Sequence, residues 1–328
     1  MQKEARPIHA SPSDLPDDSP AASASPADAV AGRAVPRADP GSVLRPVEPG
    51  PELSVVVPAF NSARYIGETV GALAAFLDRR GIRGEIIVVD DGSTDDTERA
   101  AAVSPLAIVV RQPRNRGKGA ALRAGMARAR GDVRAFTDAD LPYGAEPLDR
   151  AMHYITDRKF HAVLGDRTLP GSTYADSGPL RAVVSELSSF AFRTLVTGGI
   201  YDTQCGMKAF RGDVAGELFR LARIDGFAID VELIYLLLKY RLDIKRFPVQ
   251  LQRNSPSSVR VIRDSYRAFQ DIARMRRNWT AGRYRSPYLL SLLAADMADD
   301  DSAWRRAVEE RRADVPPTST AGEGSAST

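Results

Sequence analysis

Two short stretches decide the fold: residues 53–58 read LSVVVP and residues 85–90 read EIIVVD. Each is a run of β-branched and other apolar residues, the pattern of a strand that is buried in a parallel sheet. Between them, the pattern from Ala63 to Arg80 is helical, and Gly81 and Gly84 end it. The sequence therefore predicts a strand, a helix and a second strand in succession.

The alternation continues toward the C-terminus. We expect strands at residues 106–111 and 133–137, with a helix at 118–130 between them. Strands that alternate with helices predict βαβ units and a mostly parallel sheet flanked by helices, which is a Rossmann-like α/β fold. In such sheets ligands bind outside the carboxyl ends of the strands.

The second half of the chain is less regular. Helices are expected at 152–158, 182–197 and 231–240, and strands at 162–165 and 247–251. Apolar residues at Val259, Ile262, Tyr266, Phe269 and Ile272 predict an amphipathic helix that reaches Arg277. Its apolar face can pack on the core or lie on an anionic membrane leaflet, and the sequence leaves both interpretations open.

The two ends differ in composition from the rest. Both are rich in Pro and Ser and poor in large apolar residues, so they cannot bury enough surface to offset the entropy of ordering. We expect a disordered leader at 1–50, a single catalytic domain at 51–285, a C-terminal helical segment at 286–313 and a disordered tail at 314–328.

Composition and charge exclude several classes of protein. The chain has 328 residues and a net charge of +3, a mild excess that does not call for nucleic acid. Its single cysteine, Cys205, allows neither an intrachain disulfide nor a cysteine-based zinc site. We find no run of about 18 apolar residues and no secretory signal. We therefore expect a cytoplasmic protein, with peripheral contact to the cytoplasmic membrane face left open.

The strongest chemical signal is Thr137-Asp138-Ala139-Asp140, directly after a predicted strand. Two carboxylates at this spacing can reach one divalent cation, and their hard oxygens suit Mg²⁺ or Mn²⁺. Such a cation would neutralise a diphosphate and help it leave. A pair of surface turn acids is the alternative, and the position inside a βαβ array favours the metal site.

A second signal is residues 89–95, VDDGSTD, at the end of the strand at 85–90. Carboxylates here can accept hydrogen bonds from a nucleoside, and the N–H groups of the turn and of the next helix can bind phosphate. The same residue types also serve turns and caps, with Ser93 or Thr94 as the expected N-cap of the next helix.

Together these motifs resemble glycosyltransferase family 2 over residues 53–280. The matching pieces are VVPAFN at 56–61, VDDGSTD at 89–95, NRGKGA at 115–120 and DAD at 138–140. Within the family, the sequence is most similar to the polyprenyl-phosphate (dolichyl-phosphate) sugar synthases. DTQCGMKAF at 202–210 resembles the glucosyltransferase branch. The resemblance implies a GT-A fold, a UDP-sugar donor and a lipid phosphate acceptor.

The resemblance also implies roles for single residues. It places the nucleoside at Pro58, Phe60, Asp90 and Asp91, with Lys118 near the nucleotide and Asp138 and Asp140 at the metal and sugar diphosphate. It places the acceptor phosphate at Arg167, Arg181, Ser185 and Arg253, and Asp202, Gln204 and Lys208 belong to the branch motif. Arginine suits such phosphate oxygens better than lysine because it binds them in a bidentate way.

Two positions depart from the family pattern. Ser62 stands where relatives often carry Glu after the first turn, which puts one nucleoside contact in doubt. Pro142 stands where many relatives supply a third group on the metal side, so metal retention is expected to be weaker or a water to take that place.

The mechanism depends on the acceptor. A hydroxyl acceptor needs a general base, and Asp230 or Glu232 lies where the wider family carries its acidic base motif. A phosphate monoester is already an anion near neutral pH, with a second pKa of about 6, and needs no base. The first hypothesis is therefore an inverting transfer of glucose to a polyprenyl phosphate. The alternatives are transfer to a hydroxyl of a small molecule or glycolipid, and a non-catalytic domain that binds nucleotide sugars.

Overall fold

The computed structural model describes residues 49–172, 202, 205–253 and 261–294, and of residues 261–269 it describes the backbone alone. The helix expected at 182–197 lies outside these ranges, as do most of the expected leader and all of the expected tail. No helix in the described ranges is long and apolar enough to cross a membrane.

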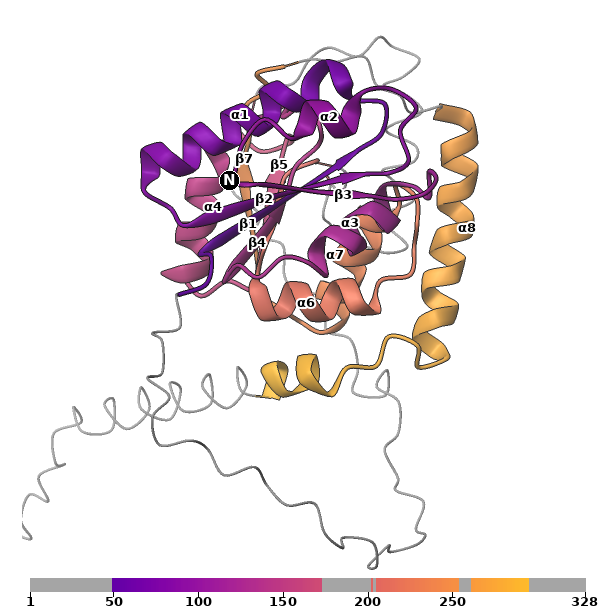
Figure 1. Ribbon diagram of the computed structural model, residues 1–328. Coiled ribbons are helices and arrows are strands. Elements are labelled where there is room, and N and C mark those ends of the chain that lie inside the picture. Colours follow the sequence, from indigo (N-terminus) through magenta and orange to yellow (C-terminus); the bar gives the residue numbers. More distant parts are fainter. Residues whose placement is uncertain (1–48, 173–201, 203–204, 254–260, 295–328) are drawn as a thin grey trace, which may run out of the picture.

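The core of the molecule is a seven-stranded sheet in the order β3-β2-β1-β4-β6-β5-β7 (Figure 1). The strands are β1 (Leu53–Ala59), β2 (Gly84–Asp90), β3 (Ala107–Arg111), β4 (Val133–Phe136), β5 (Ala162–Asp166), β6 (Lys208–Arg211) and β7 (Ile244–Pro248). Strand β6 runs antiparallel to β4 and β5, and the other pairings are parallel. The expectation of a mostly parallel sheet is confirmed.

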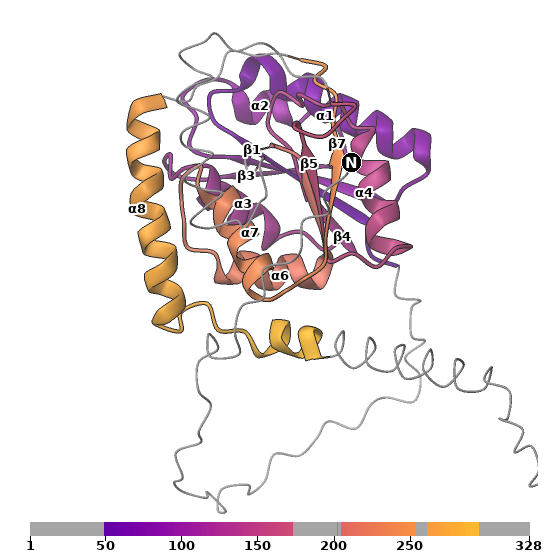
Figure 2. The same cartoon turned by 180° about the vertical axis from the view of Figure 1, so that it is seen from behind.

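Helices cover both faces of this sheet, so the domain has three layers (Figures 1 and 2). The helices are α1 (Ala63–Arg80), α2 (Thr97–Ala101), α3 (Lys118–Met126), α4 (Pro147–Thr156), α6 (Gly212–Leu221), α7 (Ile229–Lys239) and α8 (Val261–Thr280). One apolar core packs α1 and α4 on the sheet, and a second packs α3, α6 and α7 on the other face.

Strand alternation explains the two cores. In β1, Val55 and Val57 belong to the core under α1, whereas Val56 between them belongs to the core under α3. All three side chains are fully buried. A strand buried on both faces reads as a continuous apolar run, which is why the sequence identified β1 and β2 so well.

Several elements were missed or misplaced by the sequence, and one of them is α4, which begins at Pro147 although a helix was expected at 152–158. Strand β6 and helix α6 were not predicted, since β6 is short and lacks a β-branched run. Strand β7 ends at Pro248, although a strand was expected at 247–251. It is an edge strand and carries Lys245 and Arg246, charges that are common on sheet edges but hide the strand pattern.

Helix α8 is the amphipathic segment whose apolar face could either pack on the core or lie on a membrane. Ile272 and Met275 are buried in the core that contains α7, and Trp279 makes edge-to-face contacts with Tyr235 and Tyr240. In the part of α8 whose side chains are described, the apolar face is therefore used for packing and does not lie on a membrane. Its arginine-bearing side faces solvent.

Candidate active site

The loops after β1 and β2 are bound to each other at the carboxyl edge of the sheet. Asn61 N–H donates to Ser93 Oγ at 2.9 Å, and Thr94 N–H donates to Asn61 Oδ1 at 2.9 Å. Phe60 projects from this edge with 44% of its surface exposed. An exposed aromatic ring beside two polar loops can stack on a nucleobase, which fits the nucleoside role that the resemblance implies for Phe60. Pro58 precedes it on β1 and is half-buried.

The expected cap of α2 by Ser93 or Thr94 is wrong, because α2 begins only at Thr97. Asp95 of this loop and Thr97 at the start of α2 instead accept from the N–H groups of the N-cap and the first residue of α1. Ser62 N–H donates to Thr97 Oγ1 at 2.7 Å, and Ala63 N–H donates to Asp95 Oδ2 at 3.1 Å. The polar loop after β2 thus caps a helix that precedes it in the sequence.

The two aspartates at the end of β2 have different surroundings. Asp90 Oδ1 accepts from Ser93 N–H at 2.8 Å; Asp90 Oδ2 lies 3.5 Å from Arg111 but accepts no hydrogen bond within the described part of the chain. A buried carboxylate oxygen without such a partner fits a ligand donor. Asp91 accepts from the N–H groups of Arg116 and Gly117 at 2.9 and 2.7 Å. Asp91 therefore holds the turn that leads into Lys118.

Lys118, at the start of α3, joins two carboxylates that are far apart in the sequence. Its Nζ lies 2.9 Å from Asp138 Oδ1 and 3.2 Å from Asp230 Oδ2. Burial by itself would lower the pKa of Lys118, but the two carboxylates outweigh it and raise the pKa above its usual value. Lys118 is therefore a fixed positive charge beside Asp138, at the edge where a diphosphate is expected.

Gly206 is the residue that makes room for Asp138. A Cβ on Gly206 would lie 1.9 Å from Asp138 Oδ2, far inside any van der Waals contact. Sequence reasoning did not single out Gly206, although it lies inside the branch motif. The close approach depends on tertiary structure that the motif alone does not reveal.

Asp230 and Glu232, both on α7, have different environments. Asp230 is 2% exposed and is bound by Lys208 as well as by Lys118. Glu232 is fully buried and accepts from the N–H groups of Arg223 and Ile224 at 3.0 and 2.9 Å, and from the Tyr284 hydroxyl. Glu232 thus holds a loop and the C-terminal segment, and its role as a base stays a prediction.

Arg167, after β5, is bound by Asp202 through three hydrogen bonds. Arg167 Nε and Nη2 donate to the two Asp202 carboxylate oxygens at 2.8 and 2.7 Å, and the backbone N–H of Arg167 donates at 2.8 Å. Asp202, a residue of the branch motif, therefore orients Arg167, which was predicted to bind the acceptor phosphate. Arg181, Ser185 and Gln204 lie outside the described residues, so their roles stay predictions.

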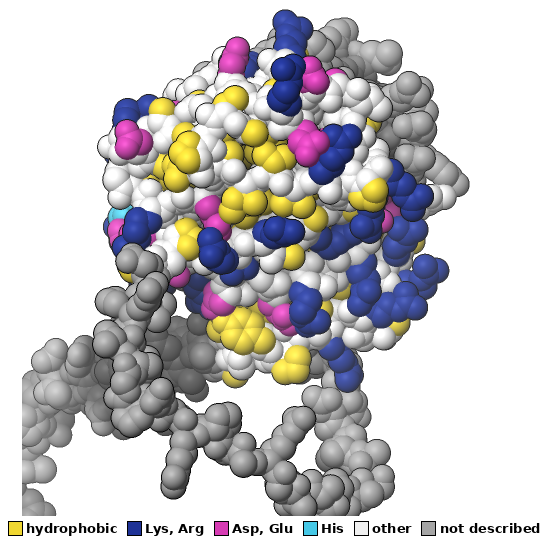
Figure 3. Space-filling view, viewed as in Figure 1, with side chains coloured by type: hydrophobic (Ala, Val, Ile, Leu, Met, Phe, Trp, Pro, Cys, Tyr) yellow, Lys and Arg dark blue, Asp and Glu magenta, His cyan; other side chains and the backbone are white. Residues whose placement is uncertain are grey.

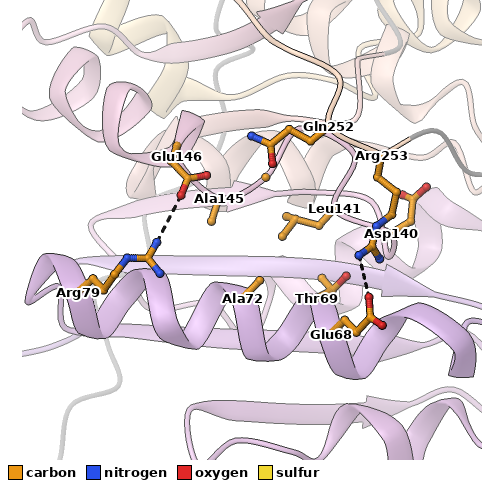
Figure 4. A pocket seen from close by; sticks show the side chains of 11 residues that line it. Glu68, Thr69, Ala72, Arg79, Asp140, Leu141, Ala145, Glu146, Gln252 and Arg253 are labelled. Carbon is orange, nitrogen blue, oxygen red and sulfur yellow. Dashed lines mark hydrogen bonds and ion pairs between the residues drawn. The ribbon is translucent and has the colours of Figure 1, made fainter. Parts of the chain in front are cut away.

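Arg253 and Asp140 meet at a groove of about 350 Å³ between α1 and the loop after β4 (Figure 4). Arg253 lies beside Asp140 in this view and forms an ion pair with Glu68 at 2.7 Å. The backbone N–H of Arg253 also donates to the Pro142 carbonyl at 3.2 Å. The structure thus brings the predicted phosphate arginine to the Asp138–Asp140 turn.

The expected metal site is only partly built from protein groups. In the described ranges, no three His, Cys, Asp or Glu side chains gather as a metal site, and Pro142 supplies no side-chain ligand. The approach of Lys118 to Asp138 shows that this corner favours positive charge. Asp138 and Asp140 fit a hard divalent cation that takes its other ligands from diphosphate oxygens and water.

Cys205 does not act as a nucleophile in this arrangement. Its thiol is fully buried, and burial raises its pKa to about 11. A reactive cysteine needs a thiolate and partial exposure. Cys205 is therefore a buried packing residue.

A Rossmann-like sheet whose carboxyl edge carries an exposed aromatic ring, the Asp138–Asp140 turn and several basic side chains is the arrangement expected of a GT-A glycosyltransferase. The sequence model of glycosyl transferase family 2 matches residues 54–219, and the chain belongs to this family.

Several curated relatives of this chain are dolichyl-phosphate beta-glucosyltransferases. The chain is 32% identical to a dolichyl-phosphate beta-glucosyltransferase of Trichomonas vaginalis, over 63% of this chain and 65% of that protein. It is 27% identical to the Saccharomyces cerevisiae enzyme of the same name, over 71% of this chain and 76% of that protein. The human enzyme of that name is 30% identical, over 61% and 67%. The chain thus spans just under two thirds of the first relative's length.

Solved structures confirm the fold. The chain resembles glucosyl-3-phosphoglycerate synthase of Mycobacterium tuberculosis in complex with Mn²⁺, UDP-glucose and phosphoglyceric acid, with a TM-score of 0.53 and 23% identity, over 69% of this chain and 80% of that one. It also resembles mannosyl-3-phosphoglycerate synthase of Rubrobacter xylanophilus, with a TM-score of 0.53 and 22% identity, over 72% and 78%.

Proposed function

We propose that this chain is an inverting glucosyltransferase that moves glucose from UDP-glucose to a polyprenyl phosphate of the dolichyl type. The names of the curated relatives support glucose as the transferred sugar and a dolichyl-type phosphate as the acceptor, and UDP as the donor nucleotide follows from the family resemblance. The observation that carries the proposal within this chain is the environment of Asp230.

Asp230 is poorly suited to act as a general base. Its carboxylate lies 2.5 Å from Lys208 Nζ and 3.2 Å from Lys118 Nζ, and the residue is buried. Burial alone would raise its pKa, but the charges of Lys118 and Lys208 outweigh it and leave the pKa below its usual value. A base needs a pKa near the working pH to take a proton efficiently. A phosphate acceptor, which needs no base, therefore fits this site better than a hydroxyl acceptor.

The described side chains divide between the two substrates. On the donor side, Asp138 and Asp140 would hold a divalent cation, which neutralises charge on the leaving diphosphate. Lys118 supplies a second positive charge there. On the acceptor side, Arg167 and Arg253 would bind phosphate oxygens. The acceptor oxygen then attacks the anomeric carbon opposite the bond to UDP; that bond breaks, and the configuration inverts.

A matched pair of acceptors tests this proposal. Purified protein is given UDP-glucose, Mg²⁺ or Mn²⁺, and either a short-chain polyprenyl phosphate or the polyprenol of the same length. We expect product from the phosphate alone. Transfer to the polyprenol or to other hydroxyl acceptors, with none to the phosphate, would contradict the proposal and return Asp230 to the role of base.

We further propose that the solvent-facing side of α8 contacts an anionic membrane surface. Arg274, Arg276 and Arg277 are exposed on this side of the helix. Lys and Arg side chains gather on the side of the molecule where α8 lies (Figure 3). A basic surface gains about 1 kcal/mol per cation near an anionic leaflet, and a lipid acceptor requires the enzyme to reach such a leaflet.

Vesicle sedimentation tests the membrane proposal. The variant Arg276→Glu/Arg277→Glu should lose binding to vesicles that contain anionic lipid, relative to the wild type. The control variant Arg79→Glu/Arg80→Glu makes the same change of charge at exposed positions of α1, far from α8 (Figures 1 and 2). Equal binding by both variants would contradict the proposal.

A further inference from the structure

The branch motif contains a buried lysine, Lys208, which the proposed function uses only as a partner of Asp230. Lys208 is the first residue of β6 and lies opposite Phe136 of β4 in the antiparallel register. Because β6 is antiparallel to β4, its start meets the carboxyl end of β4. Lys208 is fully buried, and lysine is almost never fully buried unless it is paired.

On the donor side, Lys208 binds the carboxylate that anchors Lys118. Its Nζ donates to Asp230 Oδ1 at 2.5 Å and to the Cys205 carbonyl at 2.7 Å. The other oxygen of Asp230 lies 3.2 Å from Lys118, whose Nζ also reaches Asp138. Lys118 is thus shared between two carboxylates. Lys208 holds the Asp230 carboxylate in place, and Asp230 in turn anchors Lys118. Without Lys208, Asp230 would no longer be fixed, and Lys118 would lose the position that it holds beside Asp138.

On the acceptor side, the charge of Lys208 affects Asp202. Burial by itself would raise the pKa of Asp202, but its hydrogen bonds to Arg167, and more weakly the charge of Lys208, hold the pKa below its usual value. The charge of Lys208 therefore helps to keep Asp202 ionised, and ionised Asp202 orients Arg167. Lys208 is also tied to the segment that carries Asp202, because its Nζ donates to the carbonyl of Cys205, three residues after Asp202. Ion pairs join Arg167 to Asp202 and, separately, Lys208 to Asp230 and Lys118 to Asp230 and Asp138.

We propose that Lys208 is a positioning residue that sets Lys118 at the donor diphosphate and, through Asp202, Arg167 at the acceptor phosphate. Lys208 touches neither substrate, and it fixes the distance between the cations that bind them. The donor half of this inference depends only on nucleotide binding. The acceptor half rests on the proposed function.

The test compares Lys208→Met with the wild type in the full chain. Met keeps the length of the side chain and removes the charge. We expect UDP to bind at least tenfold more weakly in calorimetry with Mn²⁺, kcat to fall about 100-fold, as displacement of a reacting group by about 1 Å can do, and the KM for the polyprenyl phosphate to rise. Unchanged UDP affinity, kcat and acceptor KM, with a lowered Tm alone, would overturn the proposal.

A second variant covers the case in which Lys208→Met fails to fold. Lys208→Met/Asp230→Asn removes both buried charges, so that neither is left unpaired, and should recover thermal stability. We expect UDP affinity and kcat to stay low in this variant because Lys118 has lost its second anchor. Recovery of both to wild-type values would overturn the proposal.

The control is Glu85→Gln, which alters a buried carboxylate at the opposite end of β2, where it accepts from Ser54 and Arg130. It should lower the Tm and leave UDP affinity and transfer unchanged. If the wild type shows no transfer to any acceptor, the proposed function fails. The calorimetric comparison of UDP binding still decides the donor half of the inference.

Discussion

At the scale of single residues, the site depends on close approach as much as on charge. The Asp138 carboxylate can lie where it does only because residue 206 has no side chain. The motif at 202–210 therefore contains one position, Gly206, at which a side chain would not fit. A side chain at position 206 would have a local effect, because only the Asp138 carboxylate would need to move.

Gly206→Ala should greatly reduce glucose transfer with little change in the fold. The new methyl group would displace the Asp138 carboxylate, and a shift of about 1 Å at a reacting group can cost about 100-fold in rate. The measurement is kcat with UDP-glucose and the polyprenyl phosphate, together with the circular dichroism spectrum. Gly71→Ala is the matched control, because a Cβ there meets nothing within 4 Å. Equal activity of the two variants would refute the steric argument.

At the scale of elements, the site is held by ties between strands and segments that are distant in the sequence. The loop after β2 caps α1, Asp91 holds the turn before α3, and Asp202 fastens the end of β5 to the segment that enters β6. Each tie is a carboxylate or hydroxyl that satisfies backbone or guanidinium donors. The strength of the hydrogen bonds to carboxylates therefore depends on pH.

The tie between Asp202 and Arg167 predicts a loss of stability in acid. The folded pKa of Asp202 lies below its usual value, so its contribution is complete above about pH 3.9, the unfolded value. That contribution disappears as the pH falls through the lower folded pKa. Asp202→Asn should be less stable than the wild type by about 2 kcal/mol near pH 7.

The measurement is the Tm of both proteins between pH 7 and pH 2. The difference between them should be constant at the upper end and shrink below about pH 4. A difference that does not change with pH would mean that the ionisation of Asp202 does not stabilise the folded state.

At the scale of the whole molecule, the C-terminal segment is part of the catalytic domain. Tyr284 and Leu289 are buried in the core that contains α6 and α7, and Ser286 and Tyr288 donate to Glu217 and Asp213 of α6. The sequence placed a boundary after residue 285, and in the structure this point lies inside a packed region. Residues as far as Leu292 contact the same core.

Leu289→Ala should lower the free energy of unfolding by about 2–5 kcal/mol, the range for deleting a buried leucine side chain. Leu289 is fully buried, whereas its neighbour Leu290 is 39% exposed. Leu290→Ala is therefore the control and should cost far less. Urea unfolding of the two variants decides the matter. Similar midpoints for both would show that the segment does not belong to the cooperative unit.

How much the sequence could predict depended on whether the signal was local. The strands β1 and β2 and the helix α1 were predicted almost to the residue because continuous apolar runs and glycine stops are local patterns. The cap of α1 by Asp95 and Thr97 was not predicted, since its partners lie more than thirty residues apart in the chain. Glu68 was missed as the partner of Arg253 for the same reason: they are 185 residues apart.

The sequence sufficed for the α/β class, the family, the strand-end carboxylates and the basic residues that we propose bind phosphates, because these follow from hydrophobic periodicity and from the resemblance of motifs of neighbouring residues. Tertiary structure alone decided which of them act together. It paired Asp230 with two lysines, which makes this carboxylate less suited to act as a base, and it bound Glu232 to the C-terminal segment. It also placed Ile272 and Met275, on the described part of the apolar face of α8, in the core. Ion pairing and burial depend on distances between elements, and a linear pattern carries no such distances.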